Sequence, residues 1–137
     1  MTAKANTKAD EAAIHKLVEG WAKAVRTKDL NGILVSHSPE ILMFDVPPPI
    51  QSKGIDAYKK TWDLFFSWAS DPVIFDIGEM NIVAGSDVAF VTALMLCAGT
   101  EANGDRIELE FRLTIGLRKI GGRWIVVHEH HSIPAVE

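Results

Sequence analysis

The feature that most constrains this chain is a change in the period of its apolar residues near Asp71-Pro72. Before this point, apolar residues recur at the spacing of a helix over 10–28 and again over 55–69, and a short helix is expected around 33–34. After it, apolar and polar residues alternate, as half-buried strands require. The chain therefore predicts helices first and a sheet afterwards.

Four strand-like segments follow the change of period, at about 73–84, 87–99, 106–119 and 123–132. Glycine-, asparagine- and aspartate-rich turns separate them, which predicts an antiparallel meander. An apolar run at 41–46, closed by three prolines, predicts one further buried strand between the helices. This order is typical of an α+β fold. A length of 137 residues fits one domain, 1–137, with residues 1–9 expected to be disordered.

Charge and composition exclude several classes of protein. The net charge is −4 and both signs are mixed along the chain, which argues against a nucleic-acid partner. No segment has the length or amphipathicity of a membrane-binding element. A single cysteine, Cys97, and no secretory signal favour a reducing, cytoplasmic location. Phosphate-binding loops and nucleophile motifs are missing, so we expect no cofactor.

The last predicted hairpin divides its residues between two faces. A two-residue turn at 121–122 would pair Thr114 with Glu129 and Arg112 with His131. The polar face then carries Glu110, Arg112, Thr114, Gly116, Ile125, Val127, Glu129 and His131. The other face carries Phe111, Leu113, Ile115, Leu117, Val126, His128 and His130.

Either face of this hairpin could be the buried one. The apolar face could pack on the helices or on a second subunit, and the polar face could be solvated or line a pocket. A β-bulge would shift the register by one residue and exchange the His128/His130 pair for the Glu129/His131 pair.

Several stretches carry a resemblance to a known family: Lys28–Ile33, Phe44–Pro47, Gly54–Tyr58, Arg112–Thr114 and Gly122–Ser132. In order and spacing they resemble the nuclear transport factor 2-like superfamily, in particular its SnoaL-like and ketosteroid isomerase-related members. The closing stretch, a tryptophan followed by His-x-His, also resembles the association domain of calcium/calmodulin-dependent protein kinase II. The resemblance implies a cone-shaped, cystatin-like fold, in which three N-terminal helices pack on a highly curved, mostly antiparallel sheet.

The resemblance also implies a function for each face of the sheet. The cone opens into an apolar pocket for a small-molecule ligand, and the outer face commonly forms a homodimer. On that basis the polar face of the last hairpin is expected to point inward. The expected dimer interface consists of Phe111, Leu113, Ile115, His128 and His130.

Asp45 is the sharpest catalytic candidate. It ends the 41–46 run and precedes Gly54 by nine residues, which matches the place of the catalytic base in ketosteroid isomerase. A carboxylate in an apolar pocket can take up and return a proton. The alternative is an aspartate that binds backbone amides beside Pro47. The two oxyanion donors of that isomerase have no counterpart, because Trp21 and Thr114 stand near their places, so steroid isomerisation is not expected.

Two further residues complete the expected catalytic set. Arg112 could clamp a carbonyl or carboxylate of the ligand, or instead pair with Glu129. His131 could act as a general acid, or instead be solvated near the chain end. The pair of His128 and His130, with His37 as a loose third, does not make up a metal site, and no metal is expected.

The expected ligand contacts come from both helical stripes and from the last strands: Trp21, Tyr58, Trp62, Phe66, Thr114 and Glu129. Two hypotheses follow. The chain is a cofactor-free isomerase, lyase, cyclase or hydrolase with Asp45 as general base, or it is a non-catalytic module for ligand binding or dimerisation. The fold hosts many activities, so the resemblance does not choose between them.

Overall fold

The computed structural model describes residues 7–135, apart from the side chain of Asp71. Its helices are α1 (Thr7–Arg26), α2 (Leu30–Leu34) and α3 (Ile55–Trp68). Its strands are β1 (His37–Phe44), β2 (Ser52–Lys53), β3 (Ser70–Ala84), β4 (Val88–Thr100), β5 (Arg106–Ile120) and β6 (Arg123–Ser132). Of the residues 1–9 that were expected to be disordered, Thr7–Ala9 belong to α1, and residues 1–6 lie outside the described part of the chain.

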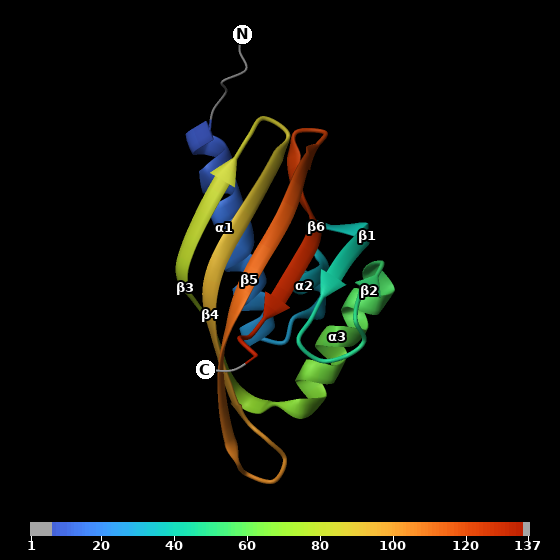
Figure 1. Cartoon of the computed structure of the whole chain (residues 1–137), viewed down its shortest axis with the longest axis vertical. Coiled ribbons are helices and arrows are strands. Elements are labelled where there is room, and N and C mark those ends of the chain that lie inside the picture. Colours follow the sequence, from blue (N-terminus) through green and yellow to red (C-terminus); the bar gives the residue numbers. More distant parts are fainter. Residues whose placement is uncertain (1–6, 136–137) are drawn as a thin grey trace.

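The strands form one sheet in the order β2-β1-β6-β5-β4-β3. Every neighbouring pair is antiparallel except β1 and β6, which run parallel. The three helices lie together on one side of the long strands, and the hairpin of β4 and β5 reaches beyond them (Figure 1). The predicted α+β class and the order of helices and strands are confirmed. The sequence did not predict β2, and β1 begins earlier than the apolar run because it includes His37 and Ser38.

The core lies between α1, α3 and the inner face of the sheet. Ile14, Val18 and Val25 of α1 are fully buried, as the predicted apolar stripe requires. Each such side chain stabilises the fold by roughly 1.5–3 kcal/mol relative to leaving it exposed. On the sheet, the alternation in β5 buries every second residue from Phe111 to Leu117.

A polar contact fixes the N-terminal end of α1 on the sheet. The Asp10 carboxylate accepts hydrogen bonds from Lys119 Nζ at 2.8 Å and from Trp124 Nε1 at 3.0 Å. Lys119 and Trp124 face each other across the β5–β6 hairpin. The hydrogen bond from Lys119 lowers the pKa of Asp10 against the opposing effect of its burial. This contact sets the position of α1 over the strands that carry the site.

A β-bulge in β6 decides which residues face the core. The turn is the predicted one, since Gly121 and Gly122 have φ values of 58° and 79°, which the favoured two-residue hairpin turn requires. The predicted pairing holds as far as Leu117 with Val126, but the next pair is Gly116 with His128. Val127 is the extra residue, and every pair beyond it is shifted by one.

The shifted register places Glu129 and His131 on the same face as the apolar residues of β5, and that face is covered by the helices. The prediction that Arg112 and Thr114 face inward is therefore wrong, since both are exposed on the outer face. The prediction of an interface at Phe111, Leu113 and Ile115 is also wrong, because these side chains are buried in the core. His128 and His130 do lie on the outer face.

Of the helices within residues 7–135, none combines the length and the apolarity that a membrane crossing requires.

Candidate functional site

The parallel pairing of β1 with β6 brings the two strongest candidates together. Phe44 at the end of β1 lies opposite His130, so the next residues, Asp45 and His131, are neighbours across the strands. Asp45 Oδ1 lies 3.6 Å from His131 Nδ1. The same oxygen accepts the backbone N–H of Val46 at 2.8 Å, which holds the carboxylate at the end of the strand. Asp45 therefore makes the backbone contact that was named as the alternative to a catalytic role, and it also lies beside a histidine.

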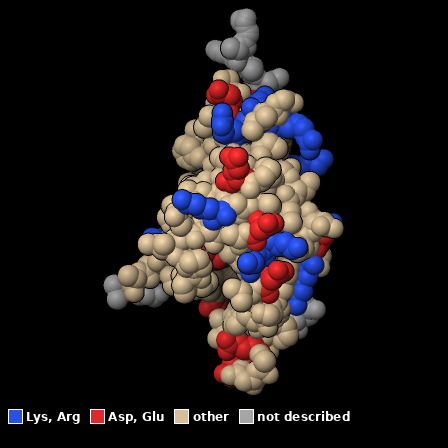
Figure 2. All heavy atoms as spheres, turned by 90° about the vertical axis from the view of Figure 1, so that its right-hand side faces the viewer, with Lys and Arg blue, Asp and Glu red and all other residues tan. Residues whose placement is uncertain are grey.

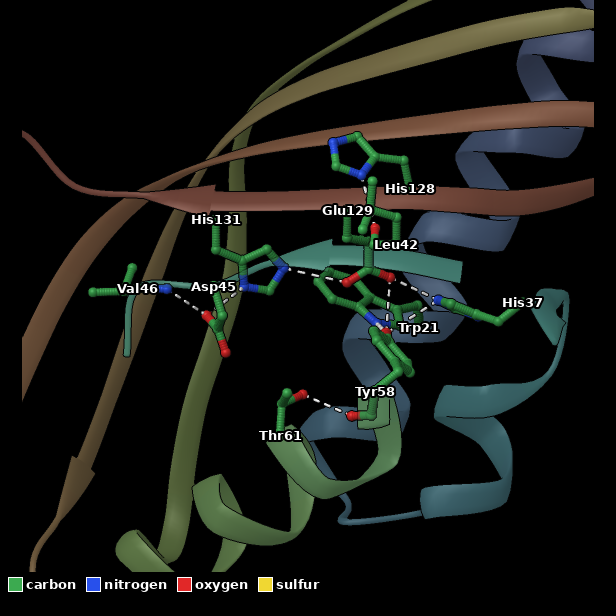
Figure 3. Close-up of polar contacts among 10 residues, drawn as sticks. All are labelled: Trp21, His37, Leu42, Asp45, Val46, Tyr58, Thr61, His128, Glu129 and His131. Atoms are coloured by element: carbon green, nitrogen blue, oxygen red, sulfur yellow. Dashed lines mark hydrogen bonds and ion pairs between the residues drawn. The ribbon is translucent and has the colours of Figure 1, made fainter. Parts of the chain in front are cut away.

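His131 lies between two carboxylates. Its Nε2 is 3.2 Å from Glu129 Oε1, on the side opposite Asp45 (Figure 3). Glu129 is completely buried, whereas the Asp45 side chain is 22% exposed. The ring of His131 packs against Phe111, with 5.1 Å between ring centroids, and against the edges of Trp21 and Trp62. His131 is thus fixed in orientation, with one nitrogen toward the core and one toward Asp45.

The second oxygen of Glu129 is the centre of a buried polar cluster. Glu129 Oε2 lies 2.7 Å from His37 Nε2 and accepts the Tyr58 hydroxyl at 2.8 Å. The Tyr58 oxygen in turn accepts the indole N–H of Trp21 at 3.1 Å. These residues come from β6, β1, α3 and α1, so the cluster joins four elements at one point (Figure 3).

The cluster keeps Glu129 ionised. Burial alone would raise its pKa, but hydrogen bonds from His131 and His37, together with their charges, lower the pKa of Glu129 to about 2. An ionised carboxylate only accepts, so His131 Nε2 must carry the proton in its hydrogen bond to Glu129. The other ring nitrogen of His131, Nδ1, then carries no proton and faces Asp45.

His37 is the second histidine that contacts Glu129. Its Nε2 faces the Glu129 carboxylate and its Nδ1 lies 3.0 Å from the carbonyl oxygen of Val35. The hydrogen bond and the charge of His37 contribute to lowering the pKa of Glu129. A buried carboxylate with such a partner avoids the large cost of an isolated buried charge.

Tyr58 completes the cluster as a neutral donor. Burial and the neighbouring Glu129 carboxylate raise the pKa of Tyr58 well above its usual value, so the hydroxyl keeps its proton. The hydrogen bond that the Trp21 indole N–H donates to the Tyr58 oxygen counteracts part of this rise. Tyr58 therefore holds Glu129 and is not itself an acid at neutral pH.

A cavity of about 750 Å³ opens beside Asp45 and His131. Its walls come from α3, the loop after β1 and the inner face of β3 to β6, and they include Val46, Pro47, Pro48, Pro49, Ser52, Ala57, Lys60, Thr61, Trp62, Leu64, Phe65, Ser67, Trp68, Phe75, Cys97, Leu109 and Phe111. The surface is hollowed in the lower half of the face on which α3 and this loop lie (Figure 2). Burial raises the pKa of the Cys97 thiol to about 11, so Cys97 is part of the apolar wall and not a nucleophile.

The expected ligand contacts are only partly at this cavity. Trp62 lines it. Trp21, Tyr58 and Glu129 lie behind His131 in the buried cluster and do not line the cavity, and Phe66 packs against Trp62 at its side. Arg112 and Thr114 are on the opposite face of the sheet.

Arg112 has a different partner from the one expected. Its Nε donates to Ser132 Oγ at 3.1 Å on the outer face, so it can clamp no ligand in the cavity. The histidines of that face are also engaged: the ring of His128 hydrogen-bonds the Leu42 carbonyl at 2.7 Å, and Phe44 packs edge-on to His128 and His130. Within residues 7–135, no group of three potential ligands is arranged to hold a metal ion.

His37 was considered from the sequence only as a loose third metal ligand, and its contact with Glu129 was not predicted. It precedes the apolar run by several positions, and no periodic pattern connects it to Glu129, 92 residues away. One feature of the sequence could have indicated this contact, namely the end of the short second helix just before His37. A strand that begins there and pairs with the last strand places His37 beside that strand.

The sequence and the fold agree with one family. A model of the SnoaL-like domain matches residues 14–136. The chain belongs to the SnoaL-like domain family. No curated protein matches the chain.

Solved structures show the same architecture. An NTF2-like protein of unknown function from Pseudomonas putida is 32% identical, with a TM-score of 0.84 over 93% of this chain and 88% of that one. The association domain of C. elegans CaMKII is 21% identical, with a TM-score of 0.73 over 93% of this chain and 98% of that one. A ketosteroid isomerase-like protein from Erwinia carotovora is 19% identical, with a TM-score of 0.76 over 88% of this chain and 93% of that one. The last two similarities show the fold alone, so the chemistry has to be inferred from the residues of the site.

Proposed function

We propose that this SnoaL-like protein is a cofactor-free acid–base enzyme of the isomerase or lyase kind, which acts on a small, largely apolar molecule in the cavity. The observation that carries the proposal is the position of His131, on the cavity wall between the Asp45 and Glu129 carboxylates. A histidine held by a buried carboxylate beside a second, accessible carboxylate is arranged for proton transfer.

Asp45 is the group that meets the ligand. Its Oδ1 is engaged by the Val46 N–H and by His131, while Oδ2 makes no hydrogen bond to a residue within 7–135. Asp45 would accept a proton from the bound molecule through this second oxygen. Such a positioned base typically contributes about 10²–10⁴-fold to a rate.

His131 would receive that proton from Asp45 at Nδ1 or return it to the ligand. The resulting imidazolium is stabilised by Glu129, because its Nε2–H already points at an ionised, buried carboxylate. The same logic of a histidine oriented and charge-stabilised by a carboxylate operates in hydrolytic triads. His37 and Tyr58 hold Glu129 in place and do not touch the ligand.

Deuterium incorporation tests this proposal without a known substrate. The protein would be incubated in D₂O with a panel of apolar ketones and hydroxyketones, and mass spectrometry would detect exchanged hydrogens or lost water. We expect turnover of at least one compound, and a loss of about 10²-fold or more in both Asp45→Asn and His131→Gln. Asp63→Asn, on the exposed side of α3, is the matched control. Turnover that survives in Asp45→Asn would remove Asp45 from the chemistry.

We propose in addition that the outer face of the sheet joins two copies of the chain. Phe90 and Leu94 on β4 are 47% and 52% exposed on that face. On β5, Arg112 lies opposite Leu94 and Glu110 opposite Leu96, so a two-fold related copy could pair these opposite charges. Sedimentation at micromolar concentration should show a dimer that Leu94→Glu separates into monomers. A monomeric wild-type protein would refute this arrangement.

A further inference from the structure

The cavity presents many hydrogen-bond acceptors and few donors. The Thr61 hydroxyl donates to the Tyr58 carbonyl at 2.7 Å, and the Ser67 hydroxyl donates to the Leu64 carbonyl at 2.8 Å. A hydroxyl has a single proton, so these two groups, both on the cavity wall, are left with lone pairs only.

The N–H groups around the cavity are engaged, missing or buried. Trp68 donates its indole N–H to Glu101 Oε2 at 2.7 Å. The indole N–H of Trp62 is buried and has no hydrogen-bond partner within residues 7–135. The Val46 N–H is bonded to Asp45, and the three prolines at 47–49 have no N–H at all. The remaining donors on the wall are the Ser52 hydroxyl and the Lys60 ammonium, and Lys60 is exposed to water.

Among the described residues, the charged groups of the wall are one carboxylate, Asp45, and one ammonium, Lys60, whose side chain is exposed to water. At the end of α3, the carbonyl oxygen of the C-cap residue Ala69 accepts a hydrogen bond from Lys28 Nζ at 3.1 Å, so this helix end adds no uncompensated negative charge. Acidic side chains also gather at the lower end of the molecule, where Glu101 and Asp105 border the turn between β4 and β5 (Figure 2).

Aromatic rings supply most of the remaining wall: Trp62, Phe65, Trp68, Phe75 and Phe111. The faces of aromatic rings carry partial negative charge and attract cations, most of all when water is excluded. A ligand with an apolar body and a positively charged head group that donates hydrogen bonds would match the aromatic rings, the hydroxyl lone pairs and the Asp45 carboxylate of this cavity.

We propose that the ligand of this cavity is an organic amine in its protonated form, with an aromatic or aliphatic body and its ammonium group on Asp45. The inference rests on the proposed function in that it uses the same cavity. It adds the charge and the donor character of the ligand, which the acid–base proposal leaves open.

Three compounds of one skeleton test the proposal: phenylbutylamine, phenylbutanol and phenylbutyrate. They share an apolar body and differ in a positive, neutral or negative head group. Isothermal titration calorimetry at neutral pH should show the amine binding roughly tenfold more tightly than the alcohol, and the carboxylate binding most weakly. Raised salt should weaken only the amine.

Two variants assign the preference to the cavity. Asp45→Asn should abolish the advantage of the amine over the alcohol, whereas Lys60→Met should increase it by removing the ammonium group from the wall. Asp63→Asn, on the exposed side of α3, should change nothing.

The outcomes separate the two proposals. If the alcohol or the carboxylate binds as tightly as the amine, the amine proposal is wrong, while deuterium exchange can still support acid–base chemistry. If none of the three compounds binds, the amine proposal is wrong as well. If the amine advantage survives in Asp45→Asn, the head group lies elsewhere.

Discussion

The buried carboxylate of Glu129 gives the most quantitative prediction. Its pKa is about 2 in the folded protein, against 4.5 for an ordinary glutamate. A folded-state pKa below the unfolded value adds stability above the unfolded pKa, and this stability is lost as the pH falls through the folded pKa. The difference corresponds to about 3 kcal/mol at neutral pH, and most of it is lost between about pH 4.5 and pH 2.5.

Glu129→Gln removes this contribution. At pH 7 the variant should be less stable by at least about 3 kcal/mol, because it also removes the carboxylate that hydrogen-bonds His37 and His131 in the core. Urea denaturation followed by tryptophan fluorescence at a series of pH values measures both effects. The wild type should lose stability below pH 4.5, and the variant should lose less over the same interval.

The difference in stability between the wild type and Glu129→Gln isolates the contribution of Glu129. Other carboxylates titrate in both, so their contributions cancel in the difference between the curves. If the two curves run parallel below pH 4.5, Glu129 is not ionised by its histidine partners and the electrostatic account of the cluster is wrong.

Three further perturbations probe other parts of the structure. Tyr58→Phe leaves the Trp21 N–H without its acceptor and should cost about 1–3 kcal/mol in urea denaturation; an unchanged stability would show that the hydroxyl is dispensable. Asp10→Asn removes a carboxylate whose pKa is lowered by the Lys119 hydrogen bond, so it should lower the melting temperature above pH 3.8 and have little effect well below it; an equal effect at both pH values would contradict the pairing. Cys97, with a pKa of about 11, should react slowly with a thiol reagent at pH 8 in the native protein and rapidly in urea; rapid native labelling would show that the thiol is accessible.

Much of the fold could be predicted from periodicity. The stripe of Ile14, Val18, Trp21 and Val25 fixes α1 because a helix with one apolar face must bury it. The long strands follow from alternation and from turn residues such as Gly121 and Gly122. β2 has two residues, too few for any period to appear.

The site could be predicted only in part. Asp45 and His131 were both named from the sequence, and parallel pairing of β1 with β6 brings them together. Arg112 was placed in the cavity because the register was carried unbroken along the hairpin. The bulge at Val127 leaves no trace in the alternation of β6, since valine suits either face, so a register argument could not detect it.

His37 and Tyr58 illustrate the second limit. Their importance comes from contacts with Glu129 across 92 and 71 residues of chain. Each looks ordinary in its own segment, a histidine before a strand and a tyrosine on a helical stripe. Only the three-dimensional structure shows that both satisfy the same carboxylate.

The central claim is that Glu129 holds His131 so that its second nitrogen serves Asp45 at the cavity wall. Nitrogen-15 NMR of the imidazole rings tests it most directly, because it reports which nitrogen carries the proton. The account predicts that His131 Nε2 is protonated and slow to exchange with solvent in the wild type and in Asp45→Asn, and that this protection is lost in Glu129→Gln. A His131 protonated at Nδ1 alone, or averaging freely between both forms, would contradict it.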